Sequence, residues 1–463
     1  MSSAVQTPTA RVLFVTLGCA KNEVDTDRMR SLLLRAGYGE AEGTVDADAV
    51  LVNTCSFLAS ATSESVERTL ELAEAAREGV RNLPIVMCGC VPSRYGSELP
   101  AELPEVAAFV RTDEEDGIVS VVDGVLGRAS LVPEATGSAA GPLAEPLRTV
   151  QGASAYVKIS DGCDRFCAFC AIPYIRGRYA SRPYLEIEAE VRALAEQGVR
   201  EFVLIGQDTG IWGQDLGDGD TLASLITRLG EVVRPYRAWL RVLYLQPEGM
   251  TDELVAAIRD VPEMLPYIDI PIQHCSAHVL KDMNRSGNAA EFSALFARLR
   301  REIPGMVLRT TGMAGFPGET EEDFEELCQF LEDEAFDYTS VFTYSPEEGT
   351  EGAEMPNQVP DDVKLDRTQA LVDIAEEMGF SATASHVGEV VDVIVDGADT
   401  DGEVPELIGH AWFQAPDCDG AVHIPEGEAA VGDMVRVRLT EAFCYELEGE
   451  IVGDDVPLTE EVA

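Results

Sequence analysis

Three cysteines lie within eight positions of one another in the stretch SDGCDRFCAFC, which ends at Cys170. Cys163, Cys167 and Cys170 have the spacing C-x3-C-x2-C. A disulfide joins two cysteines, and a closed structural zinc site takes four ligands. A zinc knuckle would need a fourth ligand at knuckle spacing, and the sequence has none there. The triplet therefore indicates a centre with three protein ligands and one open position.

An iron–sulfur cube fits this stoichiometry. Three thiolates can hold three irons of a 4Fe-4S cluster and leave the fourth iron open. An amino acid can chelate that iron through its amine and carboxylate, as the methionine part of S-adenosylmethionine (SAM) could. Electron transfer into the sulfonium then yields an adenosyl radical. We expect Phe169, directly before Cys170, to pack beside the cluster or the adenine.

A second set of three cysteines is spread over the first hundred residues. Cys19, Cys55 and Cys90 each stand just past an apolar strand pattern, RVLFVTLGC, AVLVNTC and LPIVMCGC. Helical patterns near 25–36 and 60–79 separate these strands, which predicts a parallel sheet. Ligands collect at the carboxyl edge of such a sheet. One cysteine there would be an ordinary core residue, but three at equivalent strand ends predict a shared site.

The other five cysteines have no ligand spacing. Cys88 lies two residues before Cys90 and is expected to pack in the core. The remaining ones are predicted to be structural as well: Cys275, Cys328, Cys418 and Cys444.

The elements that position these cysteines predict an α/β chain with three parts. An open parallel α/β sheet domain is expected over 10–127, and an Ala-, Gly- and Pro-rich linker over 128–150. Six strand-then-helix units over 151–380 predict a partial (β/α)6 barrel resembling a TIM barrel, with its site at the carboxyl ends of the strands. Short alternating strands over 383–455 predict a small antiparallel β-barrel.

Several residues at the barrel's predicted carboxyl edge are candidates for contact with SAM. Gly206, Gln207 and Asp208 end the second strand. Gly315 begins GFPG after the fifth strand, where a glycine lets the backbone approach a ligand closely. Lys158, in the first strand, is a candidate to orient a carboxylate of SAM or substrate.

Composition limits the class of protein. The 463 residues are 46% hydrophobic, which is typical of globular chains. No apolar run approaches the roughly 18 residues of a membrane span, and the first ten residues lack a signal-peptide pattern. We therefore predict a cytoplasmic protein that does not bind membranes. Eleven cysteines in such a compartment indicate reduced thiols, metal or clusters rather than disulfides.

The charge is strongly acidic. Formal net charge is −49, from 83 acidic and 34 basic residues. Either the source has a generally acidic proteome, or the chain avoids polyanions and favours a basic partner.

Both cysteine sets, the six β/α units and the all-β tail together resemble the radical SAM methylthiotransferases, over about residues 10–455. The resemblance implies that Cys163, Cys167 and Cys170 hold the SAM cluster. It also implies an auxiliary 4Fe-4S cluster on Cys19, Cys55 and Cys90, whose open iron carries the sulfur, and a C-terminal TRAM domain. Two SAM molecules would be used, one for the methyl group and one for the radical.

Several motifs resemble the branch of the family that modifies an aspartate of small-subunit ribosomal protein S-twelve. They are TLGCAKNEVDTD, GQDTGIWGQD, LYLQPEG, DIPIQHCSAHVLKDMNR and FTYSPEEGT. Gln273-His274 replaces the Gln-Ser-Gly-Ser form of the tRNA branch. His274 itself fits a substrate contact or a structural role equally well. Gly312 departs from the family, which usually has a bulkier residue there.

Charge favours the same branch. From Gly388 onward, twenty Asp or Glu accompany only Arg436 and Arg438, whereas binding RNA requires neutralised phosphates. We therefore expect a basic ribosomal protein as substrate, no strong nucleic-acid binding, and separate electron and sulfur donors. Two alternatives remain: a tRNA adenosine methylthiotransferase (MiaB-like), and a noncatalytic iron–sulfur or zinc scaffold.

Overall fold

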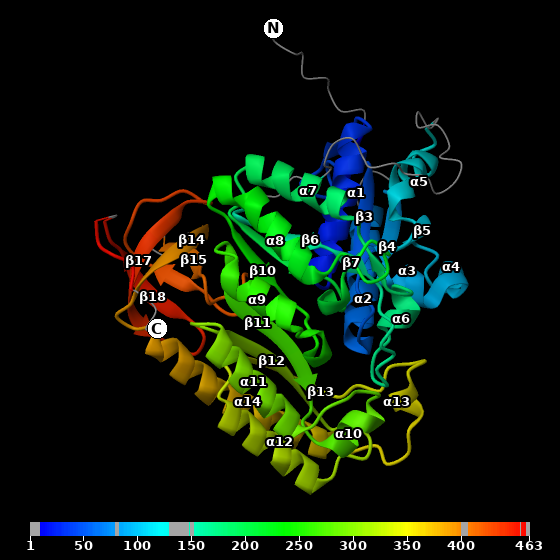
Figure 1. Cartoon of the computed structure of the whole chain (residues 1–463). Coiled ribbons are helices and arrows are strands. Elements are labelled where there is room, and N and C mark those ends of the chain that lie inside the picture. Colours follow the sequence, from blue (N-terminus) through cyan, green and yellow to red (C-terminus); the bar gives the residue numbers. More distant parts are fainter. Residues whose placement is uncertain are drawn as a thin grey trace. The chain divides into compact units, whose positions relative to one another are not determined.

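A computed structural model describes most of the chain (Figure 1). The described residues are 10–78, 83–128, 148, 152–399, 406–453 and 455–459. Apart from Arg128 and Arg148, the linker predicted over 128–150 lies outside them. The chain divides into two compact units. The first comprises 1–149, 161–164 and 170–179, and the second comprises 150–160, 165–169 and 180–463.

The first unit is built on a five-stranded sheet in the order β2-β1-β3-β4-β5, with every neighbouring pair parallel. Its strands are β1 (Arg11–Thr16), β2 (Gly39–Glu40), β3 (Ala49–Thr54), β4 (Ile85–Gly89) and β5 (Ala108–Arg111). The three strands predicted from apolar runs are confirmed as β1, β3 and β4. The edge strands β2 and β5 were not predicted, because two and four residues are too few to show periodicity.

Helices cover both faces of this sheet. They are α1 (Ala20–Arg35), α2 (Ala59–Glu78), α3 (Cys90–Tyr95), α4 (Leu99–Glu102) and α5 (Ile118–Val125). Apolar side chains of α1 and α5 pack on one face, with Leu51 and Val86 of the sheet. Those of α2 pack on the other face, with Val50 and Val52. Helix α1 begins directly after Cys19, several residues earlier than the sequence pattern predicted.

The second unit contains a six-stranded parallel sheet in the order β13-β12-β11-β10-β9-β6. Its strands are β6 (Ser154–Lys158), β9 (Glu201–Ile205), β10 (Trp239–Val242), β11 (Met264–Gln273), β12 (Val307–Ala314) and β13 (Tyr338–Thr343). Within the described residues, β6 and β13 do not pair with each other, so the sheet is open. This confirms the predicted partial (β/α)6 barrel.

Helices alternate with these strands and enclose a large apolar core. They are α7 (Tyr184–Glu196), α8 (Leu222–Val233), α9 (Asp252–Asp260), α11 (Ala289–Glu302), α12 (Glu321–Glu334) and α14 (Asp361–Ser385). Two short helices, α10 (Ala277–Asp282) and α13 (Glu351–Glu354), lie in loops that follow β11 and β13.

A small closed barrel follows α14, orange to red in Figure 1, in the order β14-β15-β16-β18-β17. Its strands are β14 (Val390–Asp399), β15 (Glu406–Ala411), β16 (Val422–Ile424), β17 (Met434–Ala442) and β18 (Leu447–Ile451). The barrel is as predicted except that β16 and β18 are parallel. Because β17 runs antiparallel to both β14 and β18, closing the barrel brings β18 beside β16 in the same direction.

A segment of the small barrel, residues 412–419, packs against the amino end of the six-stranded sheet. Arg241 of β10 donates to the carbonyl oxygens of Trp412 and Gln414, at 3.0 and 2.8 Å. Tyr156 of β6 donates to the carbonyl of Pro416 at 2.8 Å. These contacts cover the sheet's amino end around β6 and β10, whereas the carboxyl end stays accessible for a site.

No helix in the described residues is both long enough and apolar enough to cross a membrane.

Candidate cluster and cofactor sites

The three strand-end cysteines of the first unit lie together. Cys19 precedes α1, Cys55 follows β3, and Cys90 begins α3. The side-chain oxygen of Asn22 lies 3.9 Å from the sulfur of Cys19 and 4.0 Å from that of Cys90. A Cβ at Gly18 would lie 2.5 Å from the Cβ of Cys55, so the loop before Cys19 touches Cys55. The predicted convergence at the carboxyl edge is therefore present.

Gly89 makes the turn that places Cys90. Its φ of 91° is in the left-handed region, and a Cβ there would lie 2.2 Å from the side-chain oxygen of Asn53. Only glycine fits such a position without strain. The preceding Cys88 is buried in the apolar core against α1 and α5. This agrees with the sequence prediction that Cys88 packs in the core.

Two polar side chains hold the cysteine loops in place. The amide nitrogen of Asn22 donates to the carbonyl oxygens of Leu17 and Thr54, both at 2.9 Å. It thereby joins the loops after β1 and β3. Ser65 of α2 accepts from the N–H of Cys55 at 3.1 Å and donates to its carbonyl at 2.9 Å.

Arg176 adds a buried positive charge to this cysteine group. Its side chain is 2% exposed and donates to Asn22 at 2.9 Å and to Asp25 at 3.1 Å. Its Nη2 lies 4.0 Å from the sulfur of Cys90. Burial alone would lower its pKa, but Asp25 and Asp161 hold the pKa well above the usual value, so the guanidinium is charged. Sequence reasoning missed both Arg176 and Asn22, which lie 154 positions apart.

The chemistry of this group suits an iron–sulfur cluster. Burial raises the pKa of Cys55, and it raises the pKa of Cys90 to about 12 although Arg176 opposes the shift. A metal centre must therefore displace protons from these thiols. Within the described residues, no three or more His, Cys, Asp or Glu groups are arranged for a single metal ion. A cube holds each thiolate on a different iron, and Arg176 complements its negative charge.

The C-x3-C-x2-C triplet lies on a loop after β6, and its three thiols are half-buried. Cys163 and Cys170 belong to the first unit and Cys167 to the second. In the first unit, the N–H of Cys163 donates to the carbonyl of Gly177 at 3.2 Å. Gly162 has a φ of 72°, and a Cβ there would lie 2.1 Å from the carbonyl oxygen of Arg178. The turn before Cys163 therefore requires glycine.

In the second unit, loops at the carboxyl end of the sheet hold the segment around Cys167. Arg165 donates to Asp208 at 2.6 Å and to Glu248 at 3.1 Å. Asn284 donates to the carbonyl oxygens of Arg165 and Phe166, at 3.1 and 3.0 Å. Arg165 was not among the sequence candidates, because nothing local distinguishes it from other arginines.

Asp208 is a buried carboxylate with one unused oxygen. Its Oδ2 accepts from Arg165, whereas its buried Oδ1 has no hydrogen-bond partner among the described residues. Burial raises the pKa of Asp208, and Arg165 opposes that shift. A buried polar atom that lacks a hydrogen-bond partner within the protein is typical of a ligand site.

The structure also describes the other residues predicted to contact SAM. Gly206 follows β9, and a Cβ there would lie 2.4 Å from the side-chain oxygen of Ser160. Gln207 lies between Gly206 and Asp208, and Lys158 is the half-buried last residue of β6. Phe169 packs in an apolar cluster with Met283, Phe316 and Tyr344.

Gly315 and His274 already form hydrogen bonds with other groups of the protein. The N–H of Gly315 donates to Glu319 at 2.8 Å, and a Cβ on Gly315 would lie 2.3 Å from Lys364. His274 is fully buried, and its Nδ1 accepts the N–H groups of Cys275 and Ser276, both at 3.0 Å. Burial lowers the pKa of His274 to about 4, so the ring is neutral. Its Nε2 has no hydrogen-bond partner among the described residues.

Family models match all three parts of the chain. Residues 157–331 match the radical SAM superfamily, 11–111 match the uncharacterized protein family UPF0004, and 387–452 match the TRAM domain. Solved structures share the fold at low identity. A radical SAM methyltransferase, TsrM, from Kitasatospora setae aligns with a TM-score of 0.55 and 14% identity, over 85% of this chain and 78% of that one. The cobalamin-dependent radical SAM enzyme OxsB aligns with a TM-score of 0.51 and 12% identity, over 80% and 56%. Fold and motif thus define a radical SAM enzyme.

Full-length relatives narrow the class. The chain is 42% identical to the ribosomal protein uS12 methylthiotransferase RimO of Synechococcus sp. (strain RCC307). The alignment covers 98% of this chain and 92% of that protein. The protein of the same name in Pelobacter propionicus is 42% identical over 95% and 98%. The chain belongs to the RimO family of radical SAM methylthiotransferases. Its cofactors are accordingly SAM and 4Fe-4S clusters.

Proposed function

We propose that this enzyme adds a methylthio group to the β-carbon of an aspartate in small-subunit ribosomal protein S-twelve. It would use two SAM molecules and two 4Fe-4S clusters. The observation that carries the proposal is the presence of two separate sets of three cysteines, one of which converges around Asn22 and Arg176. A single radical SAM cluster would need only one set.

The proposed cluster ligands are the six cysteines. Cys163, Cys167 and Cys170 would hold the SAM cluster, and Cys19, Cys55 and Cys90 would hold the auxiliary cluster. When bound, SAM and the clusters supply the electron, radical, methyl group and sulfur that substitution at an unactivated C–H bond requires. The protein's part is to fix the thiols through Gly89, Gly162 and Asn22, and to offset the cluster's charge with Arg176.

The carboxyl end of the six-stranded sheet is the proposed SAM site. The free, buried Oδ1 of Asp208 would accept a hydrogen bond from SAM, while Arg165 holds the other oxygen in place. The other proposed contacts come from the turn after β9, the end of β6, the turn after β12 and the triplet itself: Gly206, Gln207, Lys158, Gly315 and Phe169.

Charge on the small barrel supports a protein substrate over RNA. Twenty acidic residues follow Gly388, and the two arginines are held by acidic neighbours. Arg438 lies 3.7 Å from Glu450, and Arg436 lies 3.8 Å from Asp392. These two cations cannot form a track along an RNA backbone. A basic ribosomal protein complements the acidic surface.

The proposal includes a cytoplasmic location, an electron donor and a sulfur donor as partners. It retains three domains: an auxiliary-cluster domain over 10–127, a radical SAM core over 151–380 and a TRAM domain over 383–455, with the linker between the first two.

A substrate comparison tests the proposal. The anaerobically reconstituted enzyme would be incubated with SAM, reductant and sulfide, together with ribosomal protein S-twelve or tRNA. Mass spectrometry should find a methylthio group on one aspartate of the ribosomal protein and none on tRNA. Modified tRNA beside an unmodified ribosomal protein would assign the enzyme to the tRNA branch instead.

Cluster stoichiometry is a separate test. Iron and sulfide analysis should give two 4Fe-4S clusters in the wild type and one after Cys19, Cys55 and Cys90 are replaced by alanine. Cys88→Ala is the matched control, because Cys88 is buried two residues from Cys90 and should leave both clusters in place. Zinc, or an unchanged iron content in the triple variant, would contradict the ligand assignment.

A further inference from the structure

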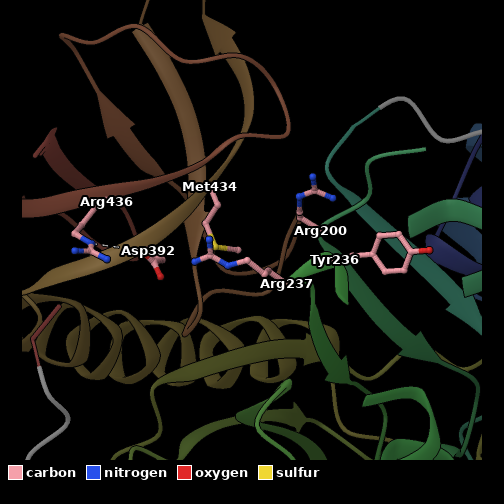
Figure 2. A pocket seen from close by; sticks show the side chains of 6 residues that line it. All are labelled: Arg200, Tyr236, Arg237, Asp392, Met434 and Arg436. Atoms are coloured by element: carbon pink, nitrogen blue, oxygen red, sulfur yellow. Dashed lines mark ion pairs between the residues drawn. The ribbon is translucent and has the colours of Figure 1, made fainter. Parts of the chain in front are cut away.

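A cavity of about 480 Å³ lies at the amino end of the six-stranded sheet, far along the strands from the carboxyl end that carries Asp208. Strands β9 and β10 start side by side there, with Trp239 opposite Glu201. The paired strands β14 and β17 of the small barrel provide the other wall. Six residues line the cavity (Figure 2): Arg200, Tyr236, Arg237, Asp392, Met434 and Arg436.

The lining carries three guanidinium groups and one carboxylate. This balance is opposite to that of the whole chain, which has 83 acidic against 34 basic residues. Asp392 pairs with Arg436 at 3.8 Å, at the long end of an ion pair. The cavity therefore has a local positive charge within an acidic protein.

Two of these arginines have no acidic partner among the residues that the structure describes. Within the described part of the chain, neither Arg200 nor Arg237 forms an ion pair. The neighbouring Arg234 shows that carboxylates are available nearby, because it binds Glu263 through two hydrogen bonds, at 2.6 and 3.2 Å. An arginine left without a carboxylate in so acidic a chain is available for an external anion.

The backbone holds both arginines at the cavity. The carbonyl of Arg200 accepts the N–H of Trp239 at 2.7 Å, which joins the turn before β9 to the first residue of β10. Arg237 has a φ of 53°, a left-handed conformation that few residues other than glycine adopt. These turns fix where the two side chains start.

We propose that this cavity binds a phosphate-bearing small molecule through Arg200 and Arg237, with Arg436, already held by Asp392 and by the carbonyl of Val456, on the opposite wall. Guanidinium groups match phosphate oxygens in bidentate geometry. The volume falls within the roughly 300–1,000 Å³ typical of small-molecule sites. A long polyanion is disfavoured, because the phosphates beyond the cavity would meet the acidic surface of the small barrel. The ligand would bridge the turns before β9 and β10 of the six-stranded sheet and strand β17 of the small barrel.

Binding of inorganic pyrophosphate and of AMP to the full-length protein tests the proposal by isothermal titration calorimetry at low ionic strength. Pyrophosphate represents a free phosphate ligand, and AMP represents a nucleotide. At least one should bind saturably, and added salt should weaken it. The R200Q/R237Q variant should weaken binding by about tenfold or more, as expected for lost charge-assisted hydrogen bonds. Asp392→Asn should strengthen it, because the only carboxylate of the lining is removed.

Arg259→Gln is the matched control. Arg259 is on α9 in the same unit and pairs only with Asp260 among the described residues, so R259Q removes one positive charge, as R200Q or R237Q alone does, without touching the cavity. Thermal unfolding without ligand would verify that every variant is folded. The proposal is overturned if neither probe binds the wild type, or if R259Q weakens binding as much as R200Q or R237Q alone. Tighter binding of a single-stranded RNA oligonucleotide than of both probes would overturn it as well.

Discussion

The six-stranded sheet buries charged groups at both of its ends, but the two ends use them differently. At the amino end, both oxygens of Glu201 are occupied, one by Arg241 at 2.6 Å and the other by His410 at 2.5 Å. At the carboxyl end, Asp208 has one oxygen on Arg165 and one buried oxygen without a partner among the described residues. Both carboxylates are almost fully buried.

A second carboxylate at the amino end behaves like Glu201. Asp419 accepts from Tyr267 and from the N–H of Ala415 through Oδ2, and from Arg309 at 3.1 Å through Oδ1. The comparison indicates that a buried charge satisfied on every side by the protein is structural. A buried charge with one side open marks the place of a ligand.

The largest expected effect concerns the reaction. Replacing Cys163, Cys167 and Cys170 by alanine should abolish methylthiolation, measured by mass spectrometry of the substrate. The free energy of unfolding of the apo-protein should change by no more than about 1 kcal/mol, because the thiols are half-buried. Cys328→Ala, at another half-buried cysteine, should retain activity. Methylthiolated product from the triple variant would show that the reaction does not require these three cysteines.

At the amino end, the expected effect is on stability. Arg241→Met leaves Glu201 buried without its main counter-charge and should lower the free energy of unfolding by about 3–5 kcal/mol. Urea unfolding measures this. Arg259→Met, at an exposed arginine, should change it by less than about 0.5 kcal/mol. A small loss in both variants would mean that the amino end is not held by this charge pair.

The amino end should also depend on pH. Burial alone would lower the pKa of His410, but Glu201 and Asp396 raise it to about 9, above the unfolded value of 6.5. The stabilisation is therefore complete below about pH 6.5 and is lost as pH rises through about 9. Its upper size is about 3 kcal/mol, from roughly 1.4 kcal/mol per pKa unit.

Urea unfolding of the wild type and of His410→Gln at pH 6.5 and pH 9.5 measures this dependence. The difference between the two proteins should shrink at the higher pH. A constant difference would show that His410 is not charged in the folded protein.

The smallest expected effect is on cofactor affinity. Asp208→Asn removes the negative charge of the carboxylate whose free Oδ1 is proposed to accept a hydrogen bond from SAM. It should weaken SAM binding about tenfold. Equilibrium dialysis with the reconstituted enzyme measures it. Asp215→Asn, at an exposed carboxylate of the same unit, is the control. If the two variants bind SAM equally, Asp208 belongs with the structural carboxylates of the amino end.

Some of these features could be predicted from the sequence, because they are local or repeat regularly. The triplet is contiguous, so its spacing alone indicated a three-ligand cluster. The strand-end cysteines followed from topology, since parallel strands bring their carboxyl ends to one edge. Six apolar runs of similar length were enough to predict the partial barrel.

The features that could not be predicted depend on long-range contacts. Arg176 meets Asn22 across 154 positions, and Glu201 meets His410 across 209. No periodicity encodes such pairs. Likewise, the parallel pairing of β16 with β18 depends on how the small barrel closes, which short alternating strands do not specify.

The closure of the sheet's amino end by residues 412–419 has a consequence for synthesis on the ribosome. Domains tend to fold from the N-terminus as the chain emerges. Here, the Nη2 of Arg241 and the hydroxyl of Tyr156 receive their carbonyl partners only after residues 414 and 416, respectively, have been made, more than 170 positions later in the case of Arg241. Until then Arg241 has Glu201 as a partner, but its Nη2 lacks both of its carbonyl acceptors. Truncation before the small barrel should therefore yield a chain that depends on chaperones, and the radical SAM core should become a stable body only when translation is nearly complete.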